Sequence, residues 1–159
     1  MATALRKTLA LATLALTASL LPTGTAGAAD VARPTTRTPG IYCLANTWNK
    51  PDVSTKVCDT NDQGQHWTVT GQQIALANAR AYCLANTWNK PDVSTKGCAS
   101  GDQGQYWTVN GDQIALTLAP AYCLANTWGT PTVSVKPCDK SDRGQHWVAF
   151  GDQISLSQV

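Results

Sequence analysis

Three copies of one short segment, spaced 40 residues apart, constrain this chain more than any other feature of its sequence. The segment reads Tyr-Cys-Leu-Ala-Asn-Thr-Trp and stands at residues 42–48, 82–88 and 122–128. A second cysteine and a Gln-x-Trp triplet recur with the same period. Self-similarity at a fixed period of this length is the signature of repeat architectures. The sequence therefore predicts one domain over 41–159, made of three tandem units at 41–80, 81–120 and 121–159.

Inside each unit the pattern is that of short strands. Apolar and polar residues alternate in runs such as 67–69 and 74–76, and a period of two is typical of half-buried strands. Asn110-Gly111 stands between two such runs and predicts a hairpin with a type I′ turn. About four short strands per unit give an all-β fold, and three equal units favour a closed barrel that leaves no strand edge exposed.

Six cysteines recur in the same pattern, one pair in each unit. Six cysteines permit 15 connectivities in principle, but the repeat favours pairing within each unit. A zinc site is the alternative, and the absence of a C-x-x-C motif with only two histidines argues against it. We therefore expect no metal and no cofactor, and three disulfides: Cys43–Cys58, Cys83–Cys98 and Cys123–Cys138.

The first residues have the pattern of a secretory signal peptide. Arg6 and Lys7 precede an apolar run over 8–21, and Ala26-Gly27-Ala28 fits a cleavage site before Ala29. A membrane anchor is the alternative, but a run of about 14 apolar residues is short for a bilayer span. We predict a signal peptide over 1–28, an N-terminal extension over 29–40, and a secreted protein with no membrane insertion.

The residues after the predicted cleavage site have no net charge. Residues 29–159 hold ten basic residues against ten Asp and no Glu. Such a chain lacks the basic surface that gains affinity by neutralising phosphates, so nucleic acid is not an expected partner. The 131 residues suffice for one modest core, and we expect a monomer.

Each unit has Cys-Leu, then a second cysteine, then Gln-x-Trp and a short hairpin. This threefold order of motifs resembles that of the ricin-B-type β-trefoil lectins from about residue 41 to 156. Within that family the chain is most similar to the small secreted haemagglutinins of actinomycetes. The resemblance implies a β-trefoil that binds cell-surface or polymeric glycans of galactose or rhamnose type.

The Trp of each Gln-x-Trp triplet is in phase with an apolar residue two positions on, which predicts a core position. Burial of three indoles, each with its N–H bonded, can anchor a small barrel. We interpret the Gln of each triplet as a structural hydrogen-bonding residue, with ligand contact as the alternative. The residues are Trp67, Trp107 and Trp147, with Gln65, Gln105 and Gln145.

The sugar site usual in this family is absent from all three units. An acidic residue is expected two positions after the first cysteine, where this chain has Ala45. An aromatic residue is expected two positions before the second cysteine, where it has Lys56, and an Asn before Gln-x-Trp, where it has Gly64. The other units repeat these departures, with Ala85, Lys96, Gly104, Ala125, Lys136 and Gly144.

Other residues of each unit must then provide a sugar site. The Trp of Asn-Thr-Trp falls at the end of the first strand beside a Pro loop, where a ring can stack on sugar C–H groups. Asn and Lys can donate hydrogen bonds, and the Asp before Gln-x-Trp can supply a carboxylate. The alternatives are that each Trp caps the barrel bottom and each Asp caps a turn. The predicted ligand-binding residues are Asn46, Trp48, Lys56, Asp62, Asn86, Trp88, Lys96, Asp102, Asn126, Trp128, Lys136 and Asp142.

The third unit differs from the first two in this loop. It has Gly-Thr-Pro-Thr over 129–132 where the others have Asn-Lys-Pro-Asp, so it lacks counterparts of Lys50 and Asp52. The sequence leaves open whether the third site resembles the first two or differs from them.

Two other classes of function compete with a multivalent lectin. An enzyme is not expected, because the chain offers no set of nucleophile, base and orienting residue. A protein-binding trefoil, such as a protease inhibitor, would present one protruding loop. The equal elaboration of three units favours several sugar sites on one monomer.

Overall fold

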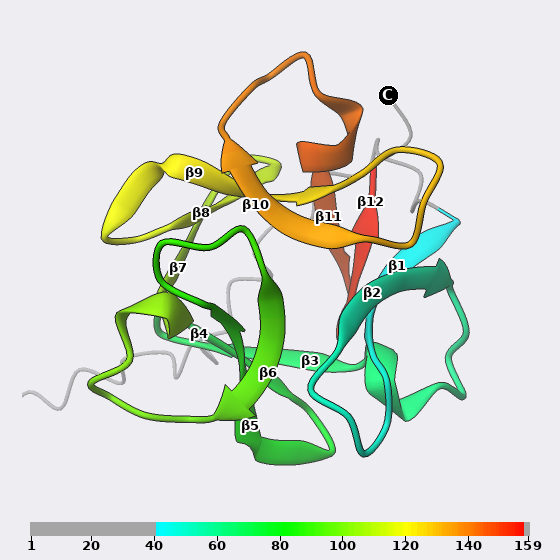
Figure 1. Cartoon of the computed structure of the whole chain (residues 1–159). Helices are drawn as coiled ribbons and strands as arrows, with labels where there is room; N and C mark the ends of the chain where they lie inside the picture. Colours follow the sequence, from blue (N-terminus) through cyan, green and yellow to red (C-terminus); the bar gives the residue numbers. More distant parts are fainter. Residues whose placement is uncertain (1–40, 158–159) are drawn as a thin grey trace, which may run out of the picture. The chain divides into compact units, whose positions relative to one another are not determined.

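The computed structural model describes residues 41–157, and these residues form an all-β domain (Figure 1). The signal peptide and extension predicted over 1–40 lie outside the described residues. The first unit contains β1 Tyr42–Asn46, β2 Val53–Val57, η1 Gln63–Gln65, β3 Trp67–Thr70 and β4 Gln73–Leu76. The second contains β5 Ala79–Asn86, β6 Val93–Gly97, η2 Gln103–Gln105, β7 Trp107–Asn110 and β8 Gln113–Leu116. The third contains β9 Ala119–Asn126, β10 Val133–Pro137, η3 Arg143–Gln145, β11 Trp147–Phe150 and β12 Gln153–Leu156.

The strands form three four-stranded antiparallel sheets that are offset from the sequence units by half a unit. One sheet has the order β3-β4-β5-β6, the second has β10-β9-β8-β7, and the third has β11-β12-β1-β2. The third sheet pairs the last hairpin of the chain with its first strand, with Cys43 opposite Ser155. This pairing closes the threefold arrangement that the repeats predict, and the chain folds as the β-trefoil that the resemblance implies.

The hairpin predicted at Asn110-Gly111 is present, but its turn differs from the prediction. Asn110 belongs to β7 and pairs with Gln113, so Gly111 and Asp112 form the two-residue loop. Gly111 has φ +65°, and neither Asn110 nor Asp112 has a positive φ. A glycine in the first central position is the pattern of a type II′ turn, so the type I′ prediction was wrong. The strand runs one residue further than the alternation suggested.

The Gln-x-Trp tryptophans lie in the core, as predicted. Their side chains are only 2–3% exposed and pack among buried Leu, Ile and Val side chains. Each indole donates its Nε1–H to the carbonyl oxygen of a buried leucine at 2.9 Å, so burial leaves no indole donor unpaired. The pairs are Trp67 with Leu44, Trp107 with Leu84, and Trp147 with Leu124.

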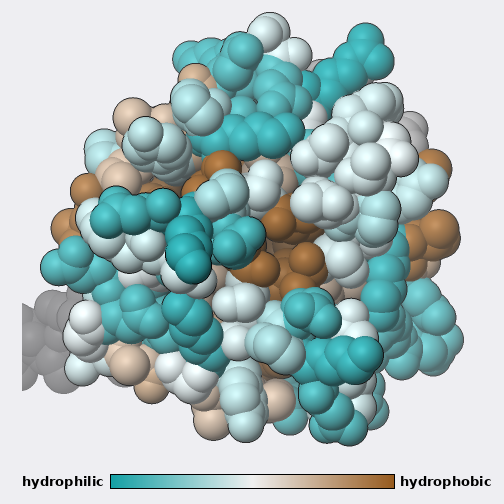
Figure 2. All heavy atoms as spheres, viewed as in Figure 1, coloured by the Kyte–Doolittle hydropathy of each residue, from teal (hydrophilic) through white to brown (hydrophobic). Residues whose placement is uncertain are grey.

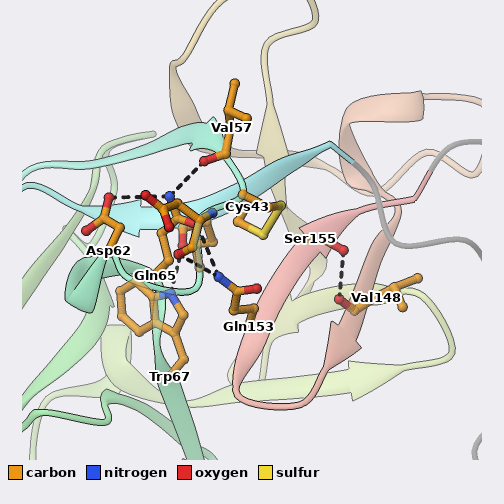
Figure 3. Close-up of a disulfide and its surroundings, with 11 residues drawn as sticks. Cys43, Val57, Asp62, Gln65, Trp67, Val148, Gln153 and Ser155 are labelled. Carbon is orange, nitrogen blue, oxygen red and sulfur yellow. Dashed lines mark hydrogen bonds between the residues drawn. A yellow bond between two sulfur atoms is a disulfide. The ribbon is translucent and has the colours of Figure 1, made fainter.

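The cysteines and the Gln-x-Trp glutamines have structural roles within each unit, as predicted. The three disulfides pair the cysteines within each unit. Gln65 is 1% exposed; its Nε2 donates to the Val57 carbonyl at 2.9 Å, and its Oε1 accepts from the Asp59 amide at 2.9 Å (Figure 3). Gln105 and Gln145 make the equivalent bonds. These glutamines are therefore structural.

Each unit also reaches onto the next one through the loop that holds its proline. We call residues 47–52, 87–92 and 127–132 the Pro loops. The carbonyl of Pro51 accepts from the Thr95 amide at 2.7 Å, and Pro91 and Pro131 make the same bond to Val135 and Thr55. Strands β2, β6 and β10 are mutual neighbours at one end of the domain (Figure 1). Figure 2 shows hydrophobic residues near the middle of this face, surrounded by hydrophilic ones.

Within the part of the chain that the structure describes, no helix has the length and apolar character to cross a membrane.

Candidate functional site

Three equivalent pockets lie where a Pro loop meets the first strand of the following unit. Site 1 lies between loop 47–52 and β5, site 2 between loop 87–92 and β9, and site 3 between loop 127–132 and β1. Their volumes are about 460, 440 and 370 Å³. Because the third Pro loop meets the first strand of the chain, closure of the trefoil is required to complete site 3.

Each site has an aromatic residue from each of its two units. The Trp of Asn-Thr-Trp comes from the Pro loop, and the Tyr comes from the strand of the next unit. The tryptophans are 48–63% exposed and the tyrosines 44–51%, so rings of both kinds are open to a ligand. Whether each Trp also caps the barrel bottom is not decided by this exposure, because about half of each side chain is covered. The pairs are Trp48 with Tyr82, Trp88 with Tyr122, and Trp128 with Tyr42.

The tyrosines were missed in the sequence prediction. Tyr82 directly precedes a buried cysteine and begins the repeated segment, but its partner Trp48 lies 34 positions earlier in the chain. The available signal was an aromatic residue repeated three times at the exposed start of a strand. Nothing local to one unit indicated that this ring faces the preceding Pro loop.

The predicted asparagines line the sites, and they also hold the Pro loops in place. Asn46 is 3% exposed, and its Nδ2 donates to the carbonyls of Lys50 and Asp52 at 2.8 and 3.1 Å. Asn86 and Asn126 make the equivalent two bonds within their own loops. The amide nitrogen is thus committed to the loop, and a role of these residues in ligand binding stays a prediction.

The third Pro loop keeps the conformation of the first two despite its different sequence. Asn49 and Asn89 have φ of 63° and 60°, and Gly129 has φ of 78°. Glycine and asparagine are the residues that adopt this left-handed region most readily. The substitution at 129 therefore preserves the turn that presents Trp128.

The predicted lysines and aspartates lie beside the 3-10 turns, outside the linings of the three sites. Asp62 Oδ1 accepts from the Gly64 amide at 2.9 Å, and Lys56 Nζ donates to Asp62 Oδ2 at 3.4 Å. Partial burial alone would raise the pKa of Asp62, but the Gly64 amide and the Lys56 ammonium hold that pKa below its ordinary value. Asp102 and Asp142 cap their turns in the same way.

The alternative that each Asp caps a turn is therefore confirmed. The structure brings Trp48 and Asp62 together only in a smaller hollow of about 250 Å³, which Asn61, Gln63 and Gly64 also line. Whether these lysines and aspartates also contact a ligand stays a prediction.

Two of the three positions of the usual family site, those of Ala45 and Gly64, are closed by packing. Ala45 is completely buried, so a longer acidic side chain has no room there. A Cβ at Gly64 would collide with the carbonyl oxygen of Asn46, which excludes asparagine without a backbone shift. The equivalent residues in the other two units, Ala85, Gly104, Ala125 and Gly144, are packed in the same way.

The groups that line the three sites offer apolar contacts and hydrogen bonds. Two exposed rings offer apolar faces, and the Pro-loop rim offers polar groups. Among the described residues, no cluster of His, Cys, Asp and Glu could hold a metal ion.

Comparison with known proteins identifies the family. The model of the ricin-type beta-trefoil lectin domain matches residues 36–155. No curated protein matches the chain.

Solved structures with the same fold share little sequence with this chain. One is GalNAc-T7 with UDP, GalNAc and Mn2+, at a TM-score of 0.59 and 17% identity; the match covers 70% of this chain and only 20% of that one. A second is the Vibrio vulnificus hemolysin/cytolysin β-trefoil lectin with N-acetyl-D-lactosamine, at 0.56 and 21%, covering 74% and 88% of the two chains. A third is the C-half of the earthworm R-type lectin with GalNAc, at 0.53 and 13%, covering 76% and 100%. At these identities the likeness shows the fold.

Proposed function

The chain belongs to the ricin-type β-trefoil lectin family, and we propose that it is a secreted, non-catalytic carbohydrate-binding protein with one shallow sugar site in each of sites 1–3. The observation that carries this proposal is the threefold repetition of an exposed Trp and an exposed Tyr, from neighbouring units, that line one pocket. Aromatic faces contact the apolar C–H groups of a sugar ring, while a few polar groups at the rim orient its hydroxyls.

The Pro loops are suited to this task because their shape is set before a ligand arrives. The Asn46 side chain donates two hydrogen bonds to carbonyls of its own loop, and the Pro51 carbonyl accepts a hydrogen bond from the Thr95 amide of the next unit. A loop held in this way loses little conformational freedom on binding, which favours affinity in a shallow site.

Three weak sites on one rigid body support multivalent binding. A single shallow site with a dissociation constant near millimolar corresponds to about 4 kcal/mol. Simultaneous engagement of two or three sites on a surface dense in one glycan can raise the apparent affinity by roughly 10²-fold or more. A monomer with three such sites can also cross-link cells, which is the activity of a haemagglutinin.

The glycan class in this proposal is of galactose or rhamnose type. Two solved structures of the same fold contain N-acetyl-D-lactosamine and GalNAc, and these sugars support the galactose side of that expectation. Secretion would follow cleavage of the predicted signal peptide near Ala28 and Ala29.

The proposal is tested by isothermal titration of the protein with galactose, GalNAc, lactosamine and rhamnose, with competition by the free sugars against an immobilised glycan. We expect three sites per chain. Saturation at one site per chain would contradict trivalency, and the absence of a response to any sugar on a wide glycan panel would contradict sugar binding itself.

Replacement of Trp48, Trp88 and Trp128 together by Ala identifies the sites. We expect sugar binding to be abolished with the circular dichroism spectrum of a folded β protein intact, because these side chains are exposed. Unfolding of the triple variant, or unchanged affinity, would contradict the assignment.

A further inference from the structure

The three sites share their aromatic walls but differ in charge at the rim. Lys50 lines site 1 and Lys90 lines site 2, and each is the one charged side chain among the described residues of its lining. Site 3 has Thr130 at the corresponding place. The carboxylates of Asp52 and Asp92 follow the prolines and lie outside the linings.

The two rim ammonium groups are available to a ligand. Elsewhere in the fold, Lys56 and Lys136 form ion pairs with Asp62 and Asp142 at 3.4 and 3.9 Å. Within residues 41–157, no ion pair to Lys50 or Lys90 is formed. Lys56 and Lys136 are thus neutralised by ion pairs within the protein, whereas Lys50 and Lys90, like Lys96, form none within residues 41–157.

Site 3 lacks the charge, and the hydroxyl that takes the place of the ammonium group is not free to donate. The Thr130 hydroxyl donates to the Thr127 carbonyl at 2.9 Å and accepts from the Thr132 amide at 3.3 Å. Its donor is therefore used inside the loop. In all three loops a backbone bond closes the turn at 2.9 Å, for example from the Lys50 amide to the Thr47 carbonyl. The lysine side chain of the first two loops is therefore not needed to hold the turn.

From these differences we infer that sites 1 and 2 select sugars that carry an anionic group, such as a carboxylate or a sulfate, while site 3 takes neutral sugars. The inference rests on the proposed sugar binding at these sites. An ammonium beside an aromatic wall can pair with a carboxylate or sulfate on a sugar whose ring stacks on the Trp. Exposed ion pairs of this kind change affinity by about two- to fivefold and weaken as salt rises.

The test uses matched sugars that differ in charge. Methyl galactoside is compared with methyl galacturonide and with galactose 6-sulfate, and methyl rhamnoside is an additional neutral probe, all by calorimetry at low and high salt. For the unmodified protein we expect the neutral sugars to occupy three sites with similar affinity. The anionic sugars should occupy two sites about two- to fivefold more tightly than the third, with the difference lost at high salt.

Substitution of the rim residues tests whether Lys50 and Lys90 cause the preference for anionic sugars. In the Lys50→Thr, Lys90→Thr double variant we expect sites 1 and 2 to lose their salt-sensitive preference for anionic sugars and to discriminate between the two classes no more than site 3 does. Thr130→Lys should add a third salt-sensitive site for the anionic sugars. Lys140→Thr removes an equal charge from an exposed residue outside the three linings and is the matched control.

Several results would overturn the inference. They are equal binding of neutral and anionic sugars by the unmodified protein, equal loss of both classes in the double variant, and the same effect from Lys140→Thr. In each of these cases sugar binding itself can stand. Failure of every probe to bind the unmodified protein would instead contradict the proposed function together with the inference.

Discussion

Two sets of tryptophans, each repeated three times, have opposite surroundings in this protein. Those of Gln-x-Trp are 2–3% exposed and donate their Nε1–H groups to leucine carbonyls in the core. Those of Asn-Thr-Trp are 48–63% exposed and stand on loops at unit boundaries. The same residue type therefore stabilises the fold in one place and is free to bind a ligand in the other.

The difference arises from the backbone that carries each ring. Trp67 begins β3, and pairing of that strand with β4 directs its side chain into the core opposite Leu76. Trp48 follows the end of β1, where the chain has left the sheet and turns through Asn49. Threefold repetition alone does not distinguish the sets, because duplication copies core and surface residues alike.

The strongest test of this contrast is a pair of matched substitutions. Trp67→Ala should lower the free energy of unfolding by about 3–5 kcal/mol, because it leaves a cavity and removes the donor to the Leu44 carbonyl. Trp48→Ala should change it by no more than about 0.5 kcal/mol, as exposed substitutions usually do. Denaturant unfolding of both variants measures the difference; similar losses from the two changes would remove the distinction.

A smaller effect is expected from the ring opposite Trp48. Tyr82→Ala should lower the number of sugar sites from three to two, since Tyr82 lines site 1 alone. Its stability should be nearly unchanged because the side chain is about half exposed. Calorimetry gives the stoichiometry, and Val69→Ala is a control at an exposed strand position outside the sites. Three unchanged sites would show that the tryptophan acts without its partner from the next unit.

The smallest effect concerns the residue next to the buried tryptophan. His66 Nδ1 faces Asp152 Oδ2 at 2.7 Å and Nε2 faces the Thr60 carbonyl at 3.0 Å, so both ring nitrogens meet acceptors and the doubly protonated form is favoured. Burial alone would lower the pKa of His66, but the bonds to Asp152 and Thr60 raise that pKa above its ordinary value.

A raised pKa means that the folded state binds the proton more tightly than the unfolded state. The stability from His66 is therefore fully present below the unfolded pKa of about 6.5 and is lost as the pH rises through the folded value. Unfolding free energies measured between pH 5.5 and 8.5 should fall with pH in the unmodified protein, and less so in His66→Gln. Trp48→Ala should keep the full dependence, and an equal slope in all three proteins would refute the role of His66.

Much of the scaffold could be predicted from residues close together in the chain. The cysteine pairs lie 15 positions apart and are joined as their repetition predicts. The short alternating runs correspond to strands such as β3 and β4, and Trp67 lies in the core as predicted. The phase that supported this prediction did not hold, because Val69, the apolar residue two positions on, is 53% exposed. Disulfides and hairpins are local features, so a repeating sequence records them directly.

The binding sites could be predicted only in part. Trp48 was found because it follows a strand beside a Pro loop, and Asp62 was assigned both a ligand role and the capping role that the structure shows. Tyr82 was missed because its position beside the Pro loop depends on a contact between different units, whereas Lys50 was noted as a residue whose absence from the third unit could make that site differ. The turn at Gly111 was also assigned the wrong type, since one further residue of strand pairing shifts the centre of the turn.

The sequence by itself determined that three equal units form an all-β fold, which cysteines pair, and which tryptophans are buried. Tertiary structure decided where the sites lie. The sheets are offset from the units by half a repeat, and the hydrogen bond from Thr95 to the Pro51 carbonyl brings each Pro loop against the next unit. Pairing between strands far apart in the chain is set by closure of the whole trefoil, and no single unit encodes which strand its Pro loop will face.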